Sequence, residues 1–115
     1  MAQILKNIPD KDLVNEITKL APSKEILKSF VLVYKGHKPN VALFIKSGRC
    51  LIGSEEILIV EEAGGRFLAF DELINGRACS LDVQVLEGSV VSIVDREIAH
   101  DILNFISAKE LRGKN

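Results

Sequence analysis

The stretch VALFIKSGRCLI, residues 41–52, consists of two apolar runs separated by Ser47-Gly48. A two-residue Ser-Gly connection between such runs is typical of a tight β-hairpin. In the register that this loop sets, one face of the hairpin is wholly apolar and contains Cys50. We therefore predict a hairpin with Cys50 in the core, and its cross-strand pairs are Ile45–Cys50, Leu43–Ile52, Phe44–Leu51 and Lys46–Arg49.

A second hairpin is predicted nearer the C-terminus. The segment 81–85 alternates apolar and polar residues, which is typical of a half-buried strand. A three-residue loop at Glu87-Gly88-Ser89 keeps serine out of the core, whereas a two-residue loop would place Ser92 opposite Val83. The expected pairs are Val85–Val91, Val83–Ile93 and Gln84–Ser92.

Helices are expected at both ends of this β-rich region. Residues 10–21 carry an apolar stripe with helical spacing, with Asp10 as N-cap and Pro22 as the stop. Residues 96–107 carry a second stripe behind the N-cap Asp95. We therefore expect an α+β fold with two antiparallel β-hairpins in a small sheet, packed by N- and C-terminal helices.

Two segments are ambiguous between strand and helix. The run FVLVY (30–34) keeps helical spacing but also suits a buried strand, and we favour a short helix to about Lys28 followed by a strand. Residues 57–60 are β-branched, yet the acidic start at 54–56 and the stop at Gly64-Gly65 favour a helix. A short helix is also expected over 66–74, closed by Asn75-Gly76.

Length and composition limit the class of protein. The 115 residues, 47% hydrophobic and 27% charged, indicate one globular domain over 1–115, with 1–9 and 108–115 as poorly ordered tails. The longest apolar runs are too short for a membrane span, and the first residues lack the apolar region of a signal peptide. We expect a cytoplasmic protein, and the abundance of isoleucine and lysine points to a thermophilic source.

Two segments resemble a known family. The helix-then-proline segment EITKLAP (16–22), and the run from Pro39-Asn40-Val41 through Ser47-Gly48 to Glu55-Glu56, are similar to uncharacterised protein family 0216 of archaea. The resemblance covers about residues 13–106. One departure is that Ser23-Lys24-Glu25 stands where the family carries a basic cluster. The resemblance implies no activity.

The sequence offers little that would support catalysis. Cys50 and Cys79 fit neither a Cys-x-x-Cys pair nor a zinc-ligand spacing, and are interpreted as buried structural thiols. His100 and Asp101 are neighbours on a helix, so they point about 100° apart and cannot act as a base and its orienting partner. His37 lies in a Gly/Pro loop, where sites are often found. We predict no cofactor and no metal, and keep an enzyme with an unrecognised site as an alternative.

The most informative feature is the separation of charge along the chain. Between Glu25 and Glu55 there is no acidic residue, whereas 55–72 contains six acidic residues and one arginine. The net charge is only −1, so the basic segment is a local feature. We predict a non-enzymatic binding or assembly module that self-associates, its basic face meeting the acidic face of another copy. RNA or another anionic partner is the alternative. The candidate binding residues are Lys35, His37, Lys38, Lys46 and Arg49.

Overall fold

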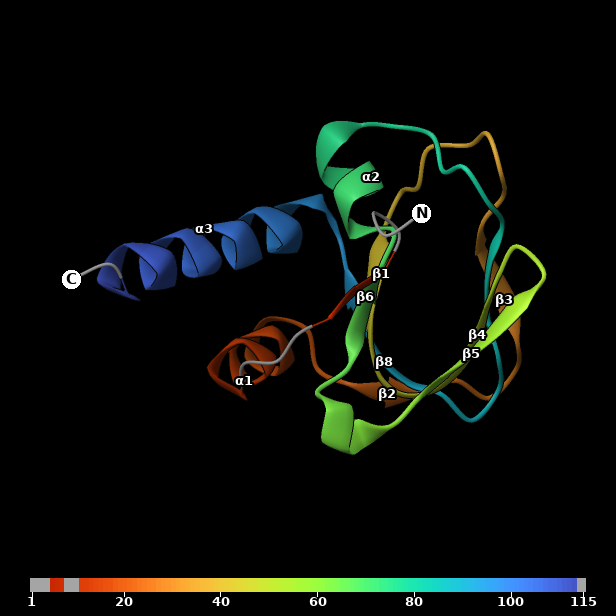
Figure 1. Ribbon diagram of the computed structural model, residues 1–115, viewed down its shortest axis with the longest axis horizontal. Helices are drawn as coiled ribbons and strands as arrows, with labels where there is room; N and C mark the ends of the chain where they lie inside the picture. Colours follow the sequence, from red (N-terminus) through yellow and green to blue (C-terminus); the bar gives the residue numbers. More distant parts are fainter. Residues whose placement is uncertain (1–4, 8–10, 114–115) are drawn as a thin grey trace.

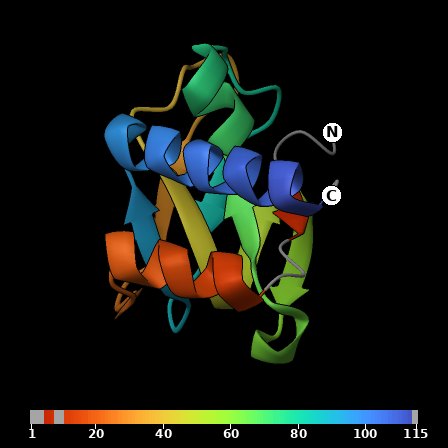
Figure 2. The same ribbon diagram turned by 90° about the vertical axis from the view of Figure 1, so that its left-hand side faces the viewer.

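A curled antiparallel sheet lies on one side of the molecule and two helices lie on the other, in a computed structural model that describes residues 5–7 and 11–113 (Figure 1). Figure 2 shows α1 and α3 side by side across one face of the sheet. In chain order the elements are β1 (Leu5–Asn7), α1 (Lys11–Leu20), β2 (Lys24–Glu25), β3 (Phe30–Val33), β4 (Ala42–Ile52), β5 (Glu55–Ile59), the 3₁₀-helix η1 (Glu61–Ala63), β6 (Arg66–Leu68), α2 (Phe70–Asn75), β7 (Val83–Val85), β8 (Val90–Val94) and α3 (Arg96–Gly113).

The long strand β4 belongs to both halves of this curled sheet. Its first half pairs with β6 and β8, and its second half pairs with β5 and β7. The first half-sheet therefore has the strand order β1-β6-β4-β8-β2, and the second has the order β5-β4-β7-β3, with every pair antiparallel. The irregularity in register between Ile45 and Ser47 marks the place where β4 passes from one half-sheet to the other.

The hairpin predicted over 41–52 is wrong, because Ser47-Gly48 is a bend within one continuous strand. Gly48 has a φ of +127°, and a Cβ atom there would lie 2.5 Å from the Cα of Ser89. The hydroxyl of the buried Ser89 accepts the N–H of Arg49 at 3.1 Å and donates to the carbonyl of Leu86 at 2.7 Å. Glycine at position 48 thus allows two backbone segments to approach closely, and does not close a turn.

The real hairpin lies one step further along the chain, at Gly53-Ser54. Strands β4 and β5 pair across it with Ile52 opposite Glu55 and Cys50 opposite Ile57. The helix that we favoured over 57–60 is therefore wrong. Ile59 is buried and packs in the interior of the sheet, so burial against β4 outweighs the helix-like flanking residues.

The second predicted hairpin is also wrong, although both of its strands exist. Strand β7 pairs with β3 and β4, whereas β8 pairs with β4 and β2. Residues 86–89 carry the chain from one half-sheet to the other. The segment before β3 forms the short strand β2 and not the short helix that we favoured, but the strand expected over 30–34 is confirmed as β3.

The helices at both ends, and with them the α+β class, are confirmed. Asp95 caps α3 as predicted, since its Oδ1 accepts the N–H of Ile98 at 2.8 Å. Helix α3 continues to Gly113, beyond the predicted end at 107.

The proposed N-cap Asp10 lies outside the described residues, as do 1–4, 8, 9, 114 and 115 of the predicted tails. Residues 66–74 form β6 followed by α2, which Gly76 ends with a φ of +62°.

Two apolar cores form because residues 42–45, in the first half of β4, are buried on both faces. The inner face of the curled sheet holds Cys50, as predicted, together with Leu43, Ile45 and buried residues of the neighbouring strands. The outer face of the first half-sheet packs against the helices through Phe44, which is fully buried beside Phe67. None of the described helices is both long enough and apolar enough to cross a membrane.

Candidate functional site

The five predicted binding residues fall in two separate places. Lys35, His37 and Lys38 lie in the exposed loop between β3 and β4. Lys46 and Arg49 lie on the same strand, on either side of the bend in β4. The prediction that they face each other across a hairpin is therefore wrong. The guanidinium of Arg49 lies 3.6 Å from the carboxylate of Glu56 on β5. The structure therefore gathers three of the five candidates and separates the other two from them.

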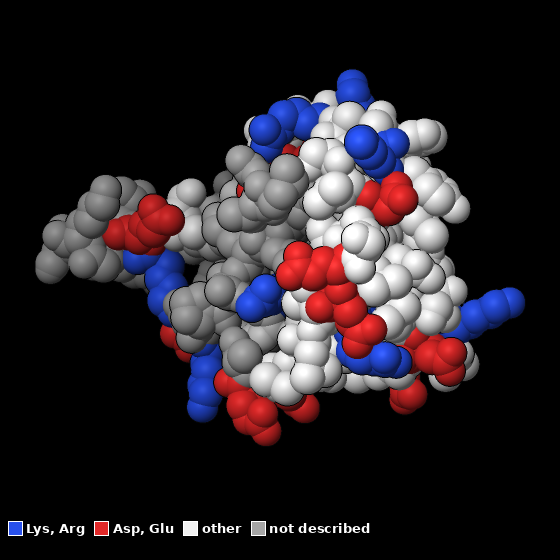
Figure 3. Space-filling model, turned by 45° about the vertical axis from the view of Figure 1, so that its right-hand side comes forward, with Lys and Arg blue, Asp and Glu red and all other residues white. Residues whose placement is uncertain are grey.

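The loop that carries Lys35, His37 and Lys38 is held by backbone hydrogen bonds. The N–H of Gly36 donates to the carbonyl of Cys79, and the N–H of Cys79 donates to the carbonyl of His37. The N–H of Lys35 donates to Oδ1 of Asp82 at 2.7 Å. These bonds fix the loop against the segment after α2. Figure 3 shows cationic side chains gathered at the upper end of the molecule, where these loops lie.

A groove of about 360 Å³ runs beside β3 and this loop. The rings of Tyr34 and His37 meet edge to face there, with their centroids 6.3 Å apart. Lys38 also lines the groove, so it combines apolar, aromatic and cationic side chains. Its lining residues are Phe30, Val31, Leu32, Val33, Tyr34, His37, Lys38, Pro39, Asn40 and Val41.

Strand β3 forms one lateral edge of the second half-sheet. Within residues 5–7 and 11–113 it pairs only with β7. Large apolar side chains are exposed here, with 36% of Phe30 and 58% of Tyr34 accessible to solvent. The exposed lysines Lys28 and Lys35 flank the strand. We call β3 with Lys28, Tyr34, Lys35 and Lys38 the basic edge.

Strand β5 forms the opposite edge of the same half-sheet, and in the described part of the chain it pairs only with β4. Leu58 is 68% exposed and Val60 is 47% exposed. The acidic residues on and after this strand, Glu55, Glu56, Glu61 and Glu62, are all exposed. We call β5 with Val60, Glu61 and Glu62 the acidic edge. Sequence reasoning identified both charged segments but missed the exposed Phe30, Leu58 and Val60 within them.

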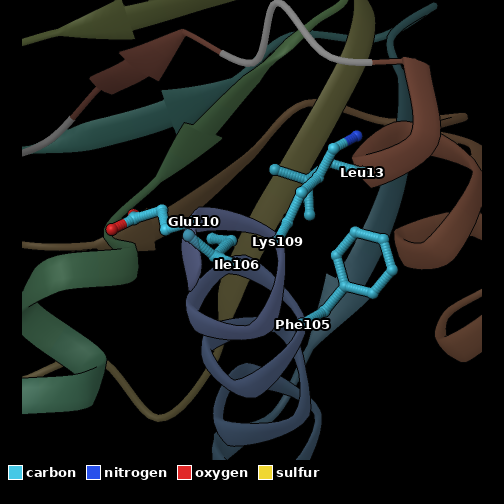
Figure 4. Close-up of a pocket in the computed structure, with 5 residues that line it drawn as sticks. All are labelled: Leu13, Phe105, Ile106, Lys109 and Glu110. Atoms are coloured by element: carbon cyan, nitrogen blue, oxygen red, sulfur yellow. The ribbon is translucent and has the colours of Figure 1, made fainter. Parts of the chain in front are cut away.

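A second hollow, of about 180 Å³, lies between α1 and α3. Figure 4 shows Leu13 and Phe105 facing each other there, whereas the carboxylate of Glu110 points away. Lys109 reaches toward α1, where its Nζ lies 2.9 Å from Oδ2 of Asp12. The hollow is lined mainly by apolar side chains, and the lysine in its lining, Lys109, contacts the carboxylate of Asp12.

The buried titratable groups are poorly suited to nucleophilic chemistry. Burial raises the pKa of the Cys50 thiol to about 11, although Arg66 opposes the shift, and burial raises the pKa of Cys79 to about 11 as well. Both thiols are therefore protonated near pH 7, where the thiolate is the reactive form. His100 is exposed on α3. No group of three or more His, Cys, Asp or Glu residues that could hold a metal occurs among the described residues.

Glu72 in α2 was not singled out by the sequence. Only 5% of it is exposed, and its Oε1 has no hydrogen-bond partner among the described residues. Burial raises the pKa of its carboxyl, and the nearby Asp71 raises it further, whereas Arg77 lowers it. A carboxyl in this environment favours its neutral form.

Comparisons with known proteins reveal the fold but no family. No family model and no curated protein matches the chain. A protein from a cyclic-GMP-dependent signalling pathway that regulates bacterial phytopathogenesis aligns with a TM-score of 0.67 and 13% identity, over 95% of this chain and 93% of that one. The EAL enzyme Bd1971, in a half-site-occupied form, aligns with a TM-score of 0.51 and 26% identity, over 83% of this chain and 98% of that one.

The Catabolite Activator Protein of Thermus thermophilus aligns with a TM-score of 0.54 and 14% identity, over 91% of this chain and 56% of that one. These likenesses show the fold alone, a curled sheet with flanking helices that this chain shares with the three proteins. They do not test the resemblance to family 0216, which stays a prediction.

Proposed function

We propose that this chain is a cytoplasmic, non-enzymatic binding module that self-associates. The observation that carries the proposal is the position of the two charged segments. The basic edge and the acidic edge are the two lateral edges of one four-stranded half-sheet, and each exposes large apolar side chains. Surfaces of opposite charge around apolar residues are complementary, so each copy offers both halves of an interface.

Two properties support a non-enzymatic module that self-associates. The two thiols have a raised pKa because they are buried, so neither is activated as a nucleophile. The net charge of −1 keeps general repulsion between copies small.

Sedimentation velocity over a concentration series at low and high salt tests this proposal. Interactions between exposed charges are screened over about 10 Å at 0.1 M salt and about 3 Å at 1 M. We therefore expect the weight-average mass to exceed that of the 12.7 kDa chain at low salt and to fall toward it at high salt. A strictly monomeric protein under all conditions would contradict the proposal.

Anion binding at the loop is the second candidate, and the groove beside β3 favours it. Lys38 and His37 supply positive or hydrogen-bonding groups, and the Tyr34 ring supplies a stacking face. A volume near 360 Å³ falls within the range of small-ligand sites. Because one structural neighbour belongs to a cyclic-GMP-dependent pathway, cyclic GMP and mixed-sequence RNA are the first probes.

Fluorescence anisotropy with labelled cyclic GMP and labelled RNA would test this candidate. We expect Lys38→Ala to reduce the binding of both probes, and we expect RNA binding, which involves many phosphates, to weaken steeply with salt. His100→Ala on the exposed face of α3 is the matched control and should bind as the unmodified protein does. Binding that ignores both salt and Lys38 would exclude this groove as an anion site.

A further inference from the structure

The directions of the strands in the second half-sheet determine how two copies could join. The order is β5-β4-β7-β3, and each neighbouring pair is antiparallel. Strand β5 is therefore parallel to β7, and β3 runs opposite to β5. If a second copy is placed beside the first without rotation, its β5 meets β3 of the first copy in the antiparallel direction. The half-sheet would continue across the junction with its alternation of direction unbroken.

The rows of side chains across the half-sheet also match at the two edges. Ile57, Cys50, Val85 and Phe30 form one row, from β5 to β3. Glu56, Leu51, Gln84 and Val31 form the next row. With no stagger between copies, Phe30 would stand beside Ile57 of the second copy. An aromatic residue next to a β-branched one is a favourable cross-strand pair.

Charge favours the pairing of a basic edge with an acidic edge over the pairing of two identical edges. Lys28, Lys35 and Lys38 surround β3 and outnumber the two nearby acids, Asp82 beside Lys35 and Glu87 beside Ser29, so two basic edges would repel each other. The acidic edge carries four exposed glutamates, and two copies of it would repel for the same reason. The partner that fits the basic edge is an extended acidic strand with exposed apolar residues, which is what β5 with Leu58 offers.

We infer that copies of this chain join head to tail, with β5 of one copy added antiparallel to β3 of the next. This inference rests on the proposed self-association. An unpaired strand edge is a ready template for another strand. The groove beside β3 leaves room for side chains of the added strand, and Tyr34 lines it. Because the two surfaces differ and the join involves no rotation, the assembly grows as an open chain and does not close into a dimer.

The inference is tested by mixing two variants, each of which has one of its two edges blocked by an introduced charge. Leu58→Lys places a cation on the acidic edge, and Phe30→Glu places an anion on the basic edge. Both positions are partly exposed, and Tyr34→Glu is a second basic-edge variant in case Phe30→Glu fails to fold. Each variant alone should raise the self-association Kd by about tenfold or more. A 1:1 mixture should form a dimer and stop there, because one intact edge of each kind remains.

Two controls separate this arrangement from others. Ile93→Lys changes a residue that is 40% exposed on β8, away from both edges, and should leave the measured mass unchanged. Phe105→Ser changes the hollow between α1 and α3, and should also have no effect on association.

Each remaining outcome has a distinct meaning. If the unmodified protein associates but neither edge variant weakens it, or if Phe105→Ser abolishes it, the head-to-tail arrangement is wrong and self-association stands. If one edge variant by itself forms dimers with the Kd of the unmodified protein, the interface joins two identical surfaces and the inference is overturned. If the unmodified protein is monomeric throughout, both the inference and the proposed function fail.

Discussion

Gly48 and Ser89 lie so close together that a Cβ atom on Gly48 would be 2.5 Å from the Cα of Ser89. The contact joins the middle of β4 to the loop between β7 and β8, where β4 passes between the two half-sheets. The bend of the sheet therefore depends on the absence of a side chain at position 48.

We expect Gly48→Ala to destabilise the protein by about 3 kcal/mol or more, since the methyl group meets backbone and the φ of +127° disfavours alanine. Gly36→Ala is the matched control, because Gly36 also has a positive φ, of +87°, but nothing lies within 4 Å of the place that a Cβ atom would take there. It should cost about 1–2 kcal/mol. Urea denaturation followed by circular dichroism measures both, and equal losses would contradict the steric explanation.

Asp95 should contribute to stability through the start of α3. Its carboxylate accepts the N–H of Ile98 at 2.8 Å. Asp95→Ala should cost about 1 kcal/mol in the free energy of unfolding, whereas Asp95→Asn retains an acceptor and should cost much less. Thermal denaturation of the two variants checks this, and identical melting temperatures would show that the cap has no measurable effect.

The raised pKa of Glu72 makes stability depend on pH. Burial is the main cause, so the folded protein holds this proton more tightly than the unfolded chain does. Between the unfolded pKa near 4.5 and the higher folded pKa, stability must fall as pH rises. Above the folded pKa the full penalty of a buried carboxylate remains.

We therefore expect Glu72→Gln to raise the melting temperature at pH 7.5 and to gain little at pH 4.5. The exposed Glu62→Gln serves as the control, because it should shift the melting temperature little at either pH. A variant that is equally stabilised at both pH values would contradict the assignment to a buried charge.

The terminal helices could be predicted because their signals are local. An apolar stripe at helical spacing and the cap at Asp95 identify α3 without reference to any other segment. The long strand β4 could not, because Phe44 faces the helices whereas Ile45 faces the interior of the sheet. With both faces buried, apolar alternation disappears, and Gly48 then resembles a turn. The pairing of β7 with β3 and β4 connects distant segments, which no local pattern encodes.

The sequence shows which residues carry the charges of the candidate site, but it does not show where those residues lie in the fold. The acid-free stretch that contains Lys35 and the acid-rich stretch that contains Glu55 are visible in the sequence. Their places at opposite edges follow from the strand order β5-β4-β7-β3, which depends on long-range pairing. Arg49 was assigned to the basic group, yet in the fold it lies beside Glu56 on the acidic edge.

The two cysteines should react slowly in the folded protein. Cys50 and Cys79 are 0% and 2% exposed, and burial raises the pKa of each to about 11. We expect a thiol reagent such as dithionitrobenzoate to modify neither at a measurable rate at pH 7.5, and both at once in denaturant. Rapid modification of the native protein would mean that the interior of the sheet opens readily.

These unreactive thiols permit the most direct test of the head-to-tail arrangement, which is disulfide cross-linking between introduced cysteines. Val31→Cys on β3 and Glu56→Cys on β5 lie in the same row of the half-sheet, at its opposite edges. A mixture of the two variants under mild oxidation at low salt should give a cross-linked dimer that contains one of each, whereas neither variant alone should. Cross-linking of Val31→Cys with itself, or no mixed dimer from a protein that associates, would contradict the arrangement.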